Sequence, residues 1–309
     1  MLSNVLNRAS RSDRARRAVE AIPVTRKVVD RFVAGADQDA ALEVARGVSG
    51  RGLATSLDIL GEGVSDIAGA RRTRDQYVTL LGALGQTGAG TGTEVSVKLS
   101  ALGQALPGDG HRVALDLAHD ICVAADAAGT MVTLDMEDHT TVDSTLAIGN
   151  ELRAEFPRTG TVLQSNLKRT AGDIADLAAD PVRIRLVKGA YKEPVSVAHQ
   201  RKAEVDEAYR GDLTRLMASA CYPMVATHDP QMVELARRLG REQERGAAGW
   251  EFQMLYGVRG DLQGALAAEG HQVRLYVPFG EEWYPYFMRR LAERPANVAF
   301  FLRALARSN

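Results

Sequence analysis

The sequence contains few cysteines and no long apolar run. Of its 309 residues only Cys122 and Cys221 are cysteines. They are too few and too far apart in the chain for a disulfide framework or a cysteine metal site, and a reducing compartment such as the cytoplasm fits this usage. No apolar run approaches the roughly 18 to 20 residues that a membrane-spanning helix requires. Any membrane contact is therefore expected to be peripheral.

Neither sign of charge dominates the chain. The formal net charge is −1 and the isoelectric point is about 6.6, which gives no global reason to expect nucleic-acid binding. With 45% hydrophobic and 25% charged residues the composition is that of a globular protein with a large core. No internal linker, low-complexity tract or proline-rich boundary divides it. We expect one catalytic domain at residues 50–309, preceded by a helical arm at residues 1–49.

The arm has a helical pattern and begins with an excess of arginine over acidic residues. Such a start is also typical of a transit peptide or of a helix that lies on a membrane surface. The segment lacks the apolar core of a secretory signal, however, and residues 24–35 are amphipathic, so they need a surface to pack on. Residues 37–49 predict a further short helix that ends at Gly50 and Gly52.

The rest of the chain alternates between strand-like runs and helical patterns. The eight predicted strands are residues 53–60, 94–99, 131–137, 161–166, 182–188, 222–227, 250–255 and 273–278. Eight strand-and-helix units indicate a closed parallel (βα)8 TIM-like barrel. A doubly wound open sheet is the competing fold, but no GxGxxG sequence follows the first strand.

In a (βα)8 barrel the chemistry takes place at the carboxyl ends of the strands. Nearly every predicted strand ends in a polar residue, and these residues are Glu62, Lys98, Asp135, Glu137, Gln164, Asn166, Lys188, Thr227, His228, Gln253 and Tyr276. Singly, each of them is more often structural than functional. Together they predict a polar mouth at one end of the barrel.

Arg185 lies inside the apolar fifth strand, where a guanidinium is costly unless an acceptor meets it. Two interpretations stay open: an anionic or electron-rich ligand, or an ion pair with Asp135 or Glu137. Gly189 would let such a ligand approach the backbone closely. The histidine at position 228 invites a metal interpretation, but no second histidine stands at ligand spacing.

A second cluster of candidate residues lies between residues 274 and 301. Trp283, Tyr286, Phe287 and Arg290 fall at helical spacing, and Arg289 lies about 100° further round the same helix. Two guanidiniums beside aromatic rings suit a small carboxylate, because the planar fork forms bidentate hydrogen bonds. The alternative is a surface helix whose arginines are solvated.

A series of motifs follows in a fixed order along the chain: SLDILGE, SVKLSALG, LDMED, LQSNL, RLVKGAY, ATHD, EFQMLYG, RLYVPFG and YPYFMRRLAERPAN. In this series the chain closely resembles the FAD-dependent proline dehydrogenase family in its short, monofunctional bacterial form, from about Ser56 to the C-terminus. The resemblance implies a distorted barrel that binds FAD and oxidises L-proline to 1-pyrroline-5-carboxylate, the first step of proline catabolism. We expect the FAD to be bound without a covalent link, because Cys122 falls in a predicted outer helix and Cys221 precedes the sixth strand, so no thiol is expected near the mouth. The resemblance further implies hydride transfer to flavin N5 and a membrane quinone as electron acceptor, with a pyrroline-5-carboxylate dehydrogenase as a candidate partner.

The resemblance also assigns site residues. Arg289 and Arg290 match the pair that binds the substrate carboxylate, with Lys98, Asp135, Tyr276, Tyr286 and Glu62 around the substrate. The positions that match contacts to the flavin are Gln164, Arg185, Val187, Lys188, Gly189, Ala190, Thr227, His228, Gln253, Leu255, Arg290, Glu293 and Phe300. Arg201 and Lys202 match looser contacts to adenosine or phosphate.

Rival functions remain open on the sequence. A folate-linked flavin reductase also places FAD on a parallel barrel. A flavin-free lyase would use Lys98 or Lys188 to form a Schiff base. A non-catalytic barrel that binds a metabolite would show no flavin reduction.

Overall fold

The computed structural model of the chain describes residues 29–88, 90 and 92–293, with side chains as far as Met288. The predicted roles of Arg289, Arg290, Glu293 and Phe300 therefore lie outside the described side chains, as does the arginine-rich start of the predicted arm. The boundary between arm and barrel at residue 50 stays a prediction.

Eight parallel strands form a closed barrel in chain order, and β8 pairs with β1 to close it. The strands are β1 (Ala54–Ile59), β2 (Thr93–Lys98), β3 (Met131–Asp135), β4 (Gly160–Gln164), β5 (Arg183–Val187), β6 (Tyr222–Ala226), β7 (Glu251–Leu255) and β8 (Val273–Phe279). The predicted (βα)8 fold is confirmed, and every predicted strand begins within one residue of an observed one.

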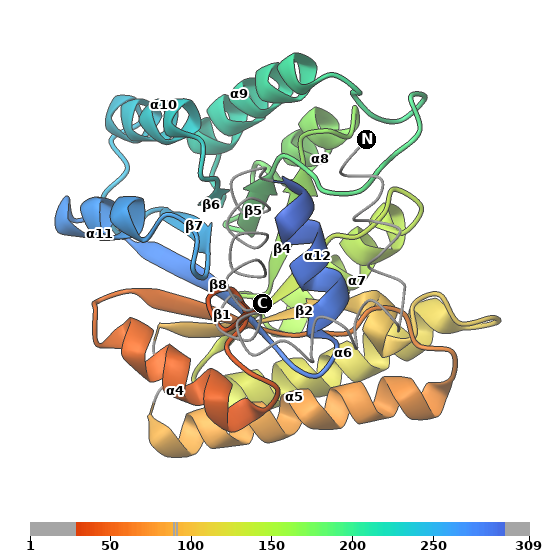
Figure 1. The fold of residues 1–309 in the computed structure, drawn as a ribbon. Coiled ribbons are helices and arrows are strands. Elements are labelled where there is room, and N and C mark those ends of the chain that lie inside the picture. Colours follow the sequence, from red (N-terminus) through yellow and green to blue (C-terminus); the bar gives the residue numbers. More distant parts are fainter. Residues whose placement is uncertain (1–28, 89, 91, 294–309) are drawn as a thin grey trace, which may run out of the picture.

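Helices follow the strands and cover the barrel from outside (Figure 1). They are α4 (Gln38–Ser49), α5 (Ile67–Thr87), the 3-10 helix η1 (Leu99–Leu102), α6 (Gly110–Ala127), α7 (Val142–Glu155), α8 (Thr170–Leu177), α9 (Lys202–Ala218), α10 (Pro230–Glu242), α11 (Gly260–Ala268) and α12 (Trp283–Glu293). The expected short helix that ends at Gly50 is α4.

Local sequence signals set several of these helix ends. Asp66 accepts a hydrogen bond from the backbone of Gly69 and begins α5, which ends at Gly88 in a left-handed conformation. Pro230 occupies the first turn of α10, and the side chain of Asp229 accepts from Gln231 N–H. These caps fix where α5 begins after β1 and where α10 begins after β6.

The apolar core lies between the strands and the surrounding helices. Leu57, Val97, Leu134 and Leu186 are fully buried there and belong to one continuous cluster with the inner faces of the helices. These residues alternate along their strands with the residues that point toward the barrel axis. Because the outward positions carry the apolar side chains, helix packing supplies most of the hydrophobic stabilisation.

The inside of the barrel is polar instead. The side chains that meet one another there are Ser56, Glu94, Ser96, Asp135, Arg183, Glu251, Gln253, Arg274 and Tyr276, and Asp58, Lys98 and Arg185 bond to members of the same group. Barrels of this class usually fill this space with branched aliphatic side chains. Burying so many charges is tolerated because they neutralise one another and are hydrogen-bonded.

A second apolar cluster lies at the carboxyl ends of the strands. Here α12 packs Tyr284, Tyr286 and Phe287 against Phe32 and Leu60, and its dark blue ribbon crosses the barrel in Figure 1. The rings of Phe32 and Phe287 are 6.4 Å apart between centroids. The aromatic face predicted for this helix is therefore buried against the barrel.

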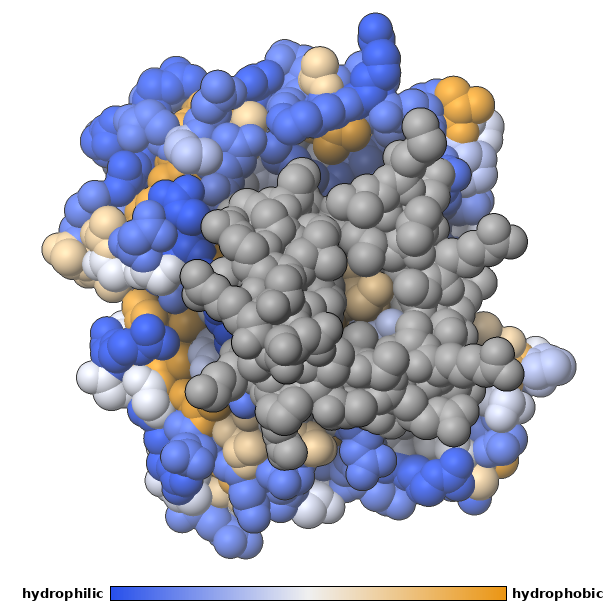
Figure 2. All heavy atoms as spheres, in the orientation of Figure 1, coloured by the Kyte–Doolittle hydropathy of each residue, from blue (hydrophilic) through white to orange (hydrophobic). Residues whose placement is uncertain are grey.

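The surface over α9 and α10 is mostly hydrophilic (Figure 2). Ion pairs such as Arg210 with Glu207 and Arg238 with Glu242 run along these helices. Within the described residues, no helix combines the length and the apolar character needed to cross a membrane.

Candidate active site

A lysine and two carboxylates meet where β1, β2 and β3 end. Lys98 Nζ lies 2.5 Å from Asp58 Oδ1 and 3.8 Å from Asp135 Oδ2. Burial lowers the pKa of Lys98, but the two carboxylates outweigh this effect and hold that pKa above its ordinary value. The lysine therefore stays an ammonium ion at neutral pH, which disfavours a nucleophilic role as a Schiff-base lysine.

Tyr276 joins this group from β8. Its hydroxyl donates to Asp135 Oδ2 at 2.7 Å, and Lys98 Nζ lies 3.5 Å from the same hydroxyl. Burial is the main reason that the pKa of Tyr276 lies well above its ordinary value, and the nearby Asp135 carboxylate raises it further. The predicted site residues Lys98, Asp135 and Tyr276 thus lie together, with a neutral phenol among charged neighbours.

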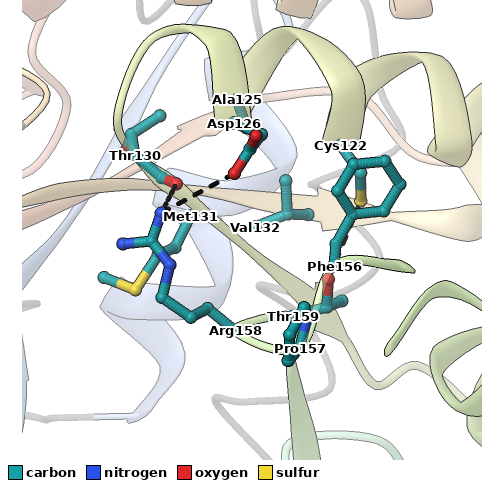
Figure 3. Close-up of a pocket in the computed structure, with 10 residues that line it drawn as sticks. All are labelled: Cys122, Ala125, Asp126, Thr130, Met131, Val132, Phe156, Pro157, Arg158 and Thr159. Atoms are coloured by element: carbon teal, nitrogen blue, oxygen red, sulfur yellow. Dashed lines mark hydrogen bonds and ion pairs between the residues drawn. The ribbon is translucent and has the colours of Figure 1, made fainter. Parts of the chain in front are cut away.

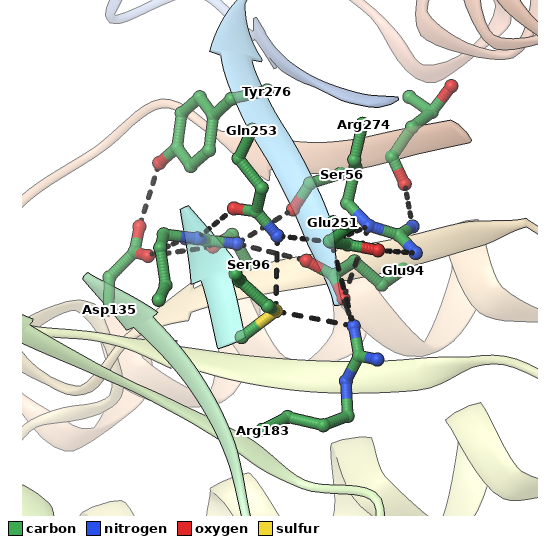
Figure 4. A network of polar contacts seen from close by, with 12 residues as sticks. Ser56, Glu94, Ser96, Asp135, Arg183, Glu251, Gln253, Arg274 and Tyr276 are labelled. Carbon is green, nitrogen blue, oxygen red and sulfur yellow. Dashed lines mark hydrogen bonds and ion pairs between the residues drawn. The ribbon is translucent and has the colours of Figure 1, made fainter. Parts of the chain in front are cut away.

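Arg185 lies next to them inside the barrel, and its five N–H groups all meet acceptors from the chain, all of them labelled in Figure 4. Its Nη1 donates to Asp135 Oδ1 at 2.6 Å and to Ser96 Oγ at 2.8 Å. Its Nη2 donates to Glu94 Oε1 at 2.9 Å and to Ser56 Oγ at 3.2 Å. The remaining Nε donates to Gln253 Oε1 at 2.5 Å.

This arrangement corrects one inference from the sequence. The burial of Arg185 does not by itself imply a ligand, because Asp135 and Glu94 neutralise it internally. The ion-pair interpretation is the observed one, with Glu94 in the place proposed for Glu137. Arg185 also lies 5.3 Å from the centre of the Tyr276 ring, so it remains next to the mouth.

Below Arg185, nearer the amino ends of the strands, lies a group of ion pairs that we call the floor of the barrel: Glu94, Arg183, Glu251 and Arg274. Glu94 pairs with Arg183 at 3.0 Å, and Glu251 pairs with Arg274 at 2.7 Å. Burial raises the pKa of Glu94, but the three surrounding guanidiniums outweigh it and lower that pKa to about 2. Gln253 joins Arg185 to Glu251, because its Oε1 accepts from Arg185 Nε and its Nε2 donates to Glu251 Oε1 at 2.6 Å.

The predicted cofactor residues of β4 and β5 form a second part of the rim. Gln164 is buried and donates to the backbone carbonyl of Glu137 at 2.8 Å. Gly189 has φ +99°, and a Cβ there would lie 2.0 Å from Asn166 Oδ1. That amide oxygen is buried and has no hydrogen-bond partner within the described part of the chain. Glycine at 189 is therefore required by the Asn166 side chain, which packs directly against its backbone where any other residue would place a Cβ.

The residues of β6 and β7 complete this side. His228 Nε2 accepts a hydrogen bond of 3.0 Å from the N–H of Leu255, so a neutral ring carries its proton on Nδ1. Thr227 is buried and its Oγ1 accepts from Asp229 N–H at 3.1 Å. Across residues 29–88 and 92–288, no three histidine, cysteine or acidic side chains come together as a metal site would require.

The remaining predicted contacts pair with nearby acidic residues, pack in an apolar cluster or are exposed. Lys188 Nζ reaches Asp206 at 2.5 Å and Asp229 at 2.8 Å, and these carboxylates outweigh partial burial in raising its pKa. Arg201 and Lys202 are about four-fifths exposed and pair with acids on α9. Val187 packs against the apolar cluster around Met136, and Ala190 is exposed.

Tyr286 and Glu62 belong to two segments at the carboxyl ends of the strands, α12 and the loop after β1. Tyr286 is buried in α12 within the same apolar cluster as Leu60, the residue that follows β1. Glu62 is exposed on the loop between β1 and α5. The backbone of Arg289 and Arg290 continues α12 beyond Tyr286.

Sequence reasoning missed Asp58 and most of the floor. Asp58, Glu94, Glu251 and Arg274 are each at most 2% exposed. A signal was present, because each is a charged residue inside an otherwise apolar strand, the same feature that singled out Arg185. Their partners come from strands far away in the chain, and sequence spacing does not show which charges meet.

A small pocket at the other end of the barrel is shown in Figure 3. Its volume is about 30 Å³, enough for one or two water molecules. Cys122 lines it, and burial raises the pKa of this thiol to about 12. A protonated, buried thiol is not a nucleophile, so this pocket does not compete with the mouth as a reaction site.

Comparisons with known proteins agree on one family. The sequence model of the proline dehydrogenase family matches residues 41–303. The chain is 41% identical over 280 residues to a proline dehydrogenase of Deinococcus radiodurans, with 90% of each chain covered. It is 35% identical over 287 residues to proline dehydrogenase 2 of Bacillus subtilis, with 92% of each covered.

A solved structure supports the same grouping. Proline utilization A (PutA) from Bdellovibrio bacteriovorus, inactivated by N-propargylglycine, superimposes with a TM-score of 0.81 at 25% identity. The match covers 87% of this chain and 33% of that protein, so the chain spans about a third of its length.

Proposed function

The chain belongs to the proline dehydrogenase family, and from this premise we propose that it oxidises L-proline to 1-pyrroline-5-carboxylate with non-covalently bound FAD. The observation that carries the proposal is the group of Lys98, Asp135 and Tyr276 at the rim, beside the buried Arg185. When bound, FAD supplies the hydride acceptor at its N5 atom.

One feature of the rim fits a flavin. Asn166, which packs against the backbone of Gly189, directs a buried acceptor, Oδ1, that has no partner in the described chain. Gln164, His228 and Gln253 place further amide and imidazole groups around the same rim. We propose that these residues hold the isoalloxazine and its ribityl chain, with Arg185, paired to Asp135 and Glu94, next to them against the Tyr276 ring.

The substrate would occupy the space between this rim and α12. Lys98 stays cationic between Asp58 and Asp135, so it can attract the proline carboxylate but is not available as a base. Tyr276 and Tyr286 would pack against the ring, and Arg289 and Arg290 would bind the carboxylate through bidentate hydrogen bonds. The protein's main task is then to orient the ring carbon beside nitrogen and to exclude water.

Electron transfer beyond the cofactor extends the proposal. We propose a membrane quinone as the acceptor, which would place the enzyme in the cytoplasm at the surface of the inner membrane. The product would pass to a pyrroline-5-carboxylate dehydrogenase.

Anaerobic titration with L-proline tests the function. The purified protein should be yellow, and proline should bleach it in the absence of oxygen. A folate-linked reductase would instead be bleached by a reduced pyridine nucleotide, and a Schiff-base lyase would be colourless and trapped by borohydride on a lysine. A flavin-loaded protein whose colour survives excess proline contradicts the proposal.

A further inference from the structure

Glu137 is a buried carboxylate at the mouth to which the proposed reaction gives no role. It follows β3, is 8% exposed, and directs both oxygens to one residue. Its Oε2 accepts the backbone N–H of Ser100 at 3.1 Å, and its Oε1 accepts the Ser100 hydroxyl at 2.7 Å. Burial raises the pKa of Glu137, and the two hydrogen bonds from Ser100 act against this.

Ser100 in turn holds the loop between β1 and α5, residues 60–66. Its Oγ accepts the N–H of Gly63 at 3.2 Å, and its carbonyl oxygen accepts the N–H of Val64 at 3.3 Å. The hydroxyl of Ser100 therefore bridges the loop and Glu137, accepting from one and donating to the other.

This loop carries Glu62 next to the residue that Ser100 holds. Gly63 has φ +64°, a left-handed conformation that glycine adopts readily and that leaves the chain much freedom when unrestrained. A loop of this kind keeps one position only if surrounding groups restrain it. The restraint at Gly63 and Val64 comes from Ser100.

The same chain of hydrogen bonds extends to the cofactor side of the rim. Gln164, at the end of β4, donates to the backbone carbonyl of Glu137 at 2.8 Å. Four successive strand ends are thus joined, from β4 through Glu137 after β3 and Ser100 after β2 to the loop after β1.

We propose that Glu137 and Ser100 are positioning residues that hold the loop of residues 60–66, and with it Glu62, over the mouth for substrate capture. The link to substrate capture rests on the proposed function. Removing the connection leaves the barrel intact but allows the loop to move, so substrate binding weakens while the chemical step is retained.

The simpler alternative is that Glu137 only caps the 3-10 helix η1, whose N-terminal N–H it accepts. Two variants separate these roles. Ser100→Ala keeps the N–H bond to Glu137 but removes the hydroxyl that reaches Gly63. Glu137→Gln keeps the side-chain shape but cannot accept both Ser100 donors through its amide group. Ser100→Thr retains a hydroxyl and should restore much of the connection.

Hydrogen exchange of the FAD-loaded, full-length protein is the first measurement. We expect exchange over residues 60–66 to be roughly 2- to 10-fold faster in Ser100→Ala and in Glu137→Gln, the range that one lost hydrogen bond gives. Ser144→Ala is the matched control. Ser144 lies on α7, and its hydroxyl contacts Gln104 at 3.0 Å and His111 at 2.8 Å. In this variant the loop of residues 60–66 should exchange as in the wild type.

Steady-state kinetics with L-proline is the second measurement. Both variants should raise KM by roughly 2- to 10-fold and leave kcat within about twofold, because binding and not chemistry is affected. Ser100→Thr should lie close to the wild type in both measurements.

The outcomes separate cleanly. Unchanged exchange over residues 60–66, or faster exchange confined to residues 99–104, overturns the proposal in favour of simple capping. Faster loop exchange with an unchanged KM overturns the role in substrate capture. If proline does not bleach the wild-type flavin, the proposed function fails, and the exchange data still decide whether the connection holds the loop.

Discussion

Tyr276 donates its hydroxyl proton to Asp135 across the mouth of the barrel, at 2.7 Å. The two residues come from β8 and β3, and the other oxygen of the same carboxylate accepts from Arg185 at 2.6 Å. One carboxylate therefore fixes both the phenol at the rim and the guanidinium beneath it. The orientation of the Tyr276 ring follows from the interior of the barrel and not from its immediate neighbours in the chain.

Replacing Tyr276 with serine should widen the substrate pocket. The transition state for proline oxidation should lose roughly 1 to 3 kcal/mol of stabilisation through lost packing, so kcat/KM for proline falls. The kcat/KM for hydroxyproline should rise relative to that for proline. The measurement is the ratio of kcat/KM for the two substrates. Tyr276→Phe is the control, because it keeps the ring and loses only the hydroxyl with its bonds to Asp135 and Lys98, so its ratio should stay near that of the wild type. An unchanged ratio in Tyr276→Ser would show that this ring does not line the pocket.

Removing Arg289 or Arg290 should leave the substrate carboxylate half-paired. Such a loss typically costs on the order of 2 to 5 kcal/mol, which is roughly a 30-fold to several thousandfold fall in kcat/KM for proline. Arg290→Ala should be at least as severe as Arg289→Ala, and lysine should rescue neither, since it lacks the planar fork.

Two measurements control this experiment. Flavin content must be determined for each variant, because Arg290 also matches a cofactor contact. Arg238→Ala removes a guanidinium that is 58% exposed on α10 and should leave turnover unchanged. If the alanine variants at 289 and 290 keep full flavin and normal turnover, the two arginines do not bind the substrate, and the alternative of solvated arginines on a surface helix is supported.

Gly189→Ala should destabilise the rim and weaken FAD retention. The new Cβ meets Asn166 Oδ1 at 2.0 Å and the backbone has φ +99°, so we expect a cost of about 1 to 3 kcal/mol. Urea unfolding and the ratio of flavin to protein are the measurements. Adding Asn166→Ala to Gly189→Ala should recover the stability lost to the clash with Asn166, but not the stability lost to the positive φ at residue 189.

Gly172→Ala serves as the matched glycine. It lies in α8 with open space around its Cβ position, so alanine should be neutral or stabilise by about 0.4 to 1 kcal/mol. Equal effects at 172 and 189 would contradict the role of the close approach between Gly189 and Asn166.

Glu94 should make the fold sensitive to acid. Its pKa in the folded protein, about 2, lies below the ordinary value of 4.5. Its contribution to stability is therefore fully present above about pH 4.5 and is lost as the pH falls toward 2. Glu94→Gln should cost about 3 to 5 kcal/mol at neutral pH, because Arg183, Arg185 and Arg274 lose a shared buried carboxylate and only Asp135 and Glu251 remain to neutralise them.

The difference between wild type and variant should shrink at pH 3, as measured by urea unfolding at both pH values. The double variant Glu94→Gln with Arg183→Gln removes one charge of each sign and should be less destabilised than Glu94→Gln alone. A difference that is the same at pH 7 and pH 3 would argue against the lowered pKa.

The flavin should leave the protein on denaturation. Cys122 and Cys221 are both buried, the first in α6 and the second just before β6, and burial raises the pKa of each thiol. Neither lies at the rim. Heat or acid treatment followed by filtration should place all yellow colour in the filtrate, and colour that stays with the precipitated protein would contradict this expectation.

The sequence predicted the strands well because each is a short apolar run between turns. Strand β5 shows the limit of this reasoning. Its apolar pattern gave residues 182–188, and the structure has Arg183–Val187. The position of Arg185 inside the barrel was correctly recognised, but its partner Glu94 was not, since a strand pattern says nothing about which side chains meet across the axis.

Lys188 illustrates a second limit. Its place after β5 predicts a side chain near the mouth but not its partners, and the structure shows its ammonium held between Asp206 of α9 and Asp229, which begins α10. A strand end fixes where a Cα lies, while a long side chain follows the nearest charges. Asp58 is the opposite case: its side chain is short and lies inside β1, and only the contact with Lys98, which comes from another strand, places it at the site.

The pairing of β8 with β1 has a consequence for how the protein is made. No earlier part of the chain can close the barrel, because Ser56 pairs in register with Tyr276. At about 5 to 20 residues per second, the ribosome needs roughly 10 to 43 seconds to synthesise the stretch from Ile59 to Val273. Throughout that time β1 has an unpaired edge, which is a template for association with other chains. Nascent chains should therefore depend on chaperones until β8 has left the ribosome, and a stop codon between α11 and β8 should yield an aggregate and not a smaller folded protein.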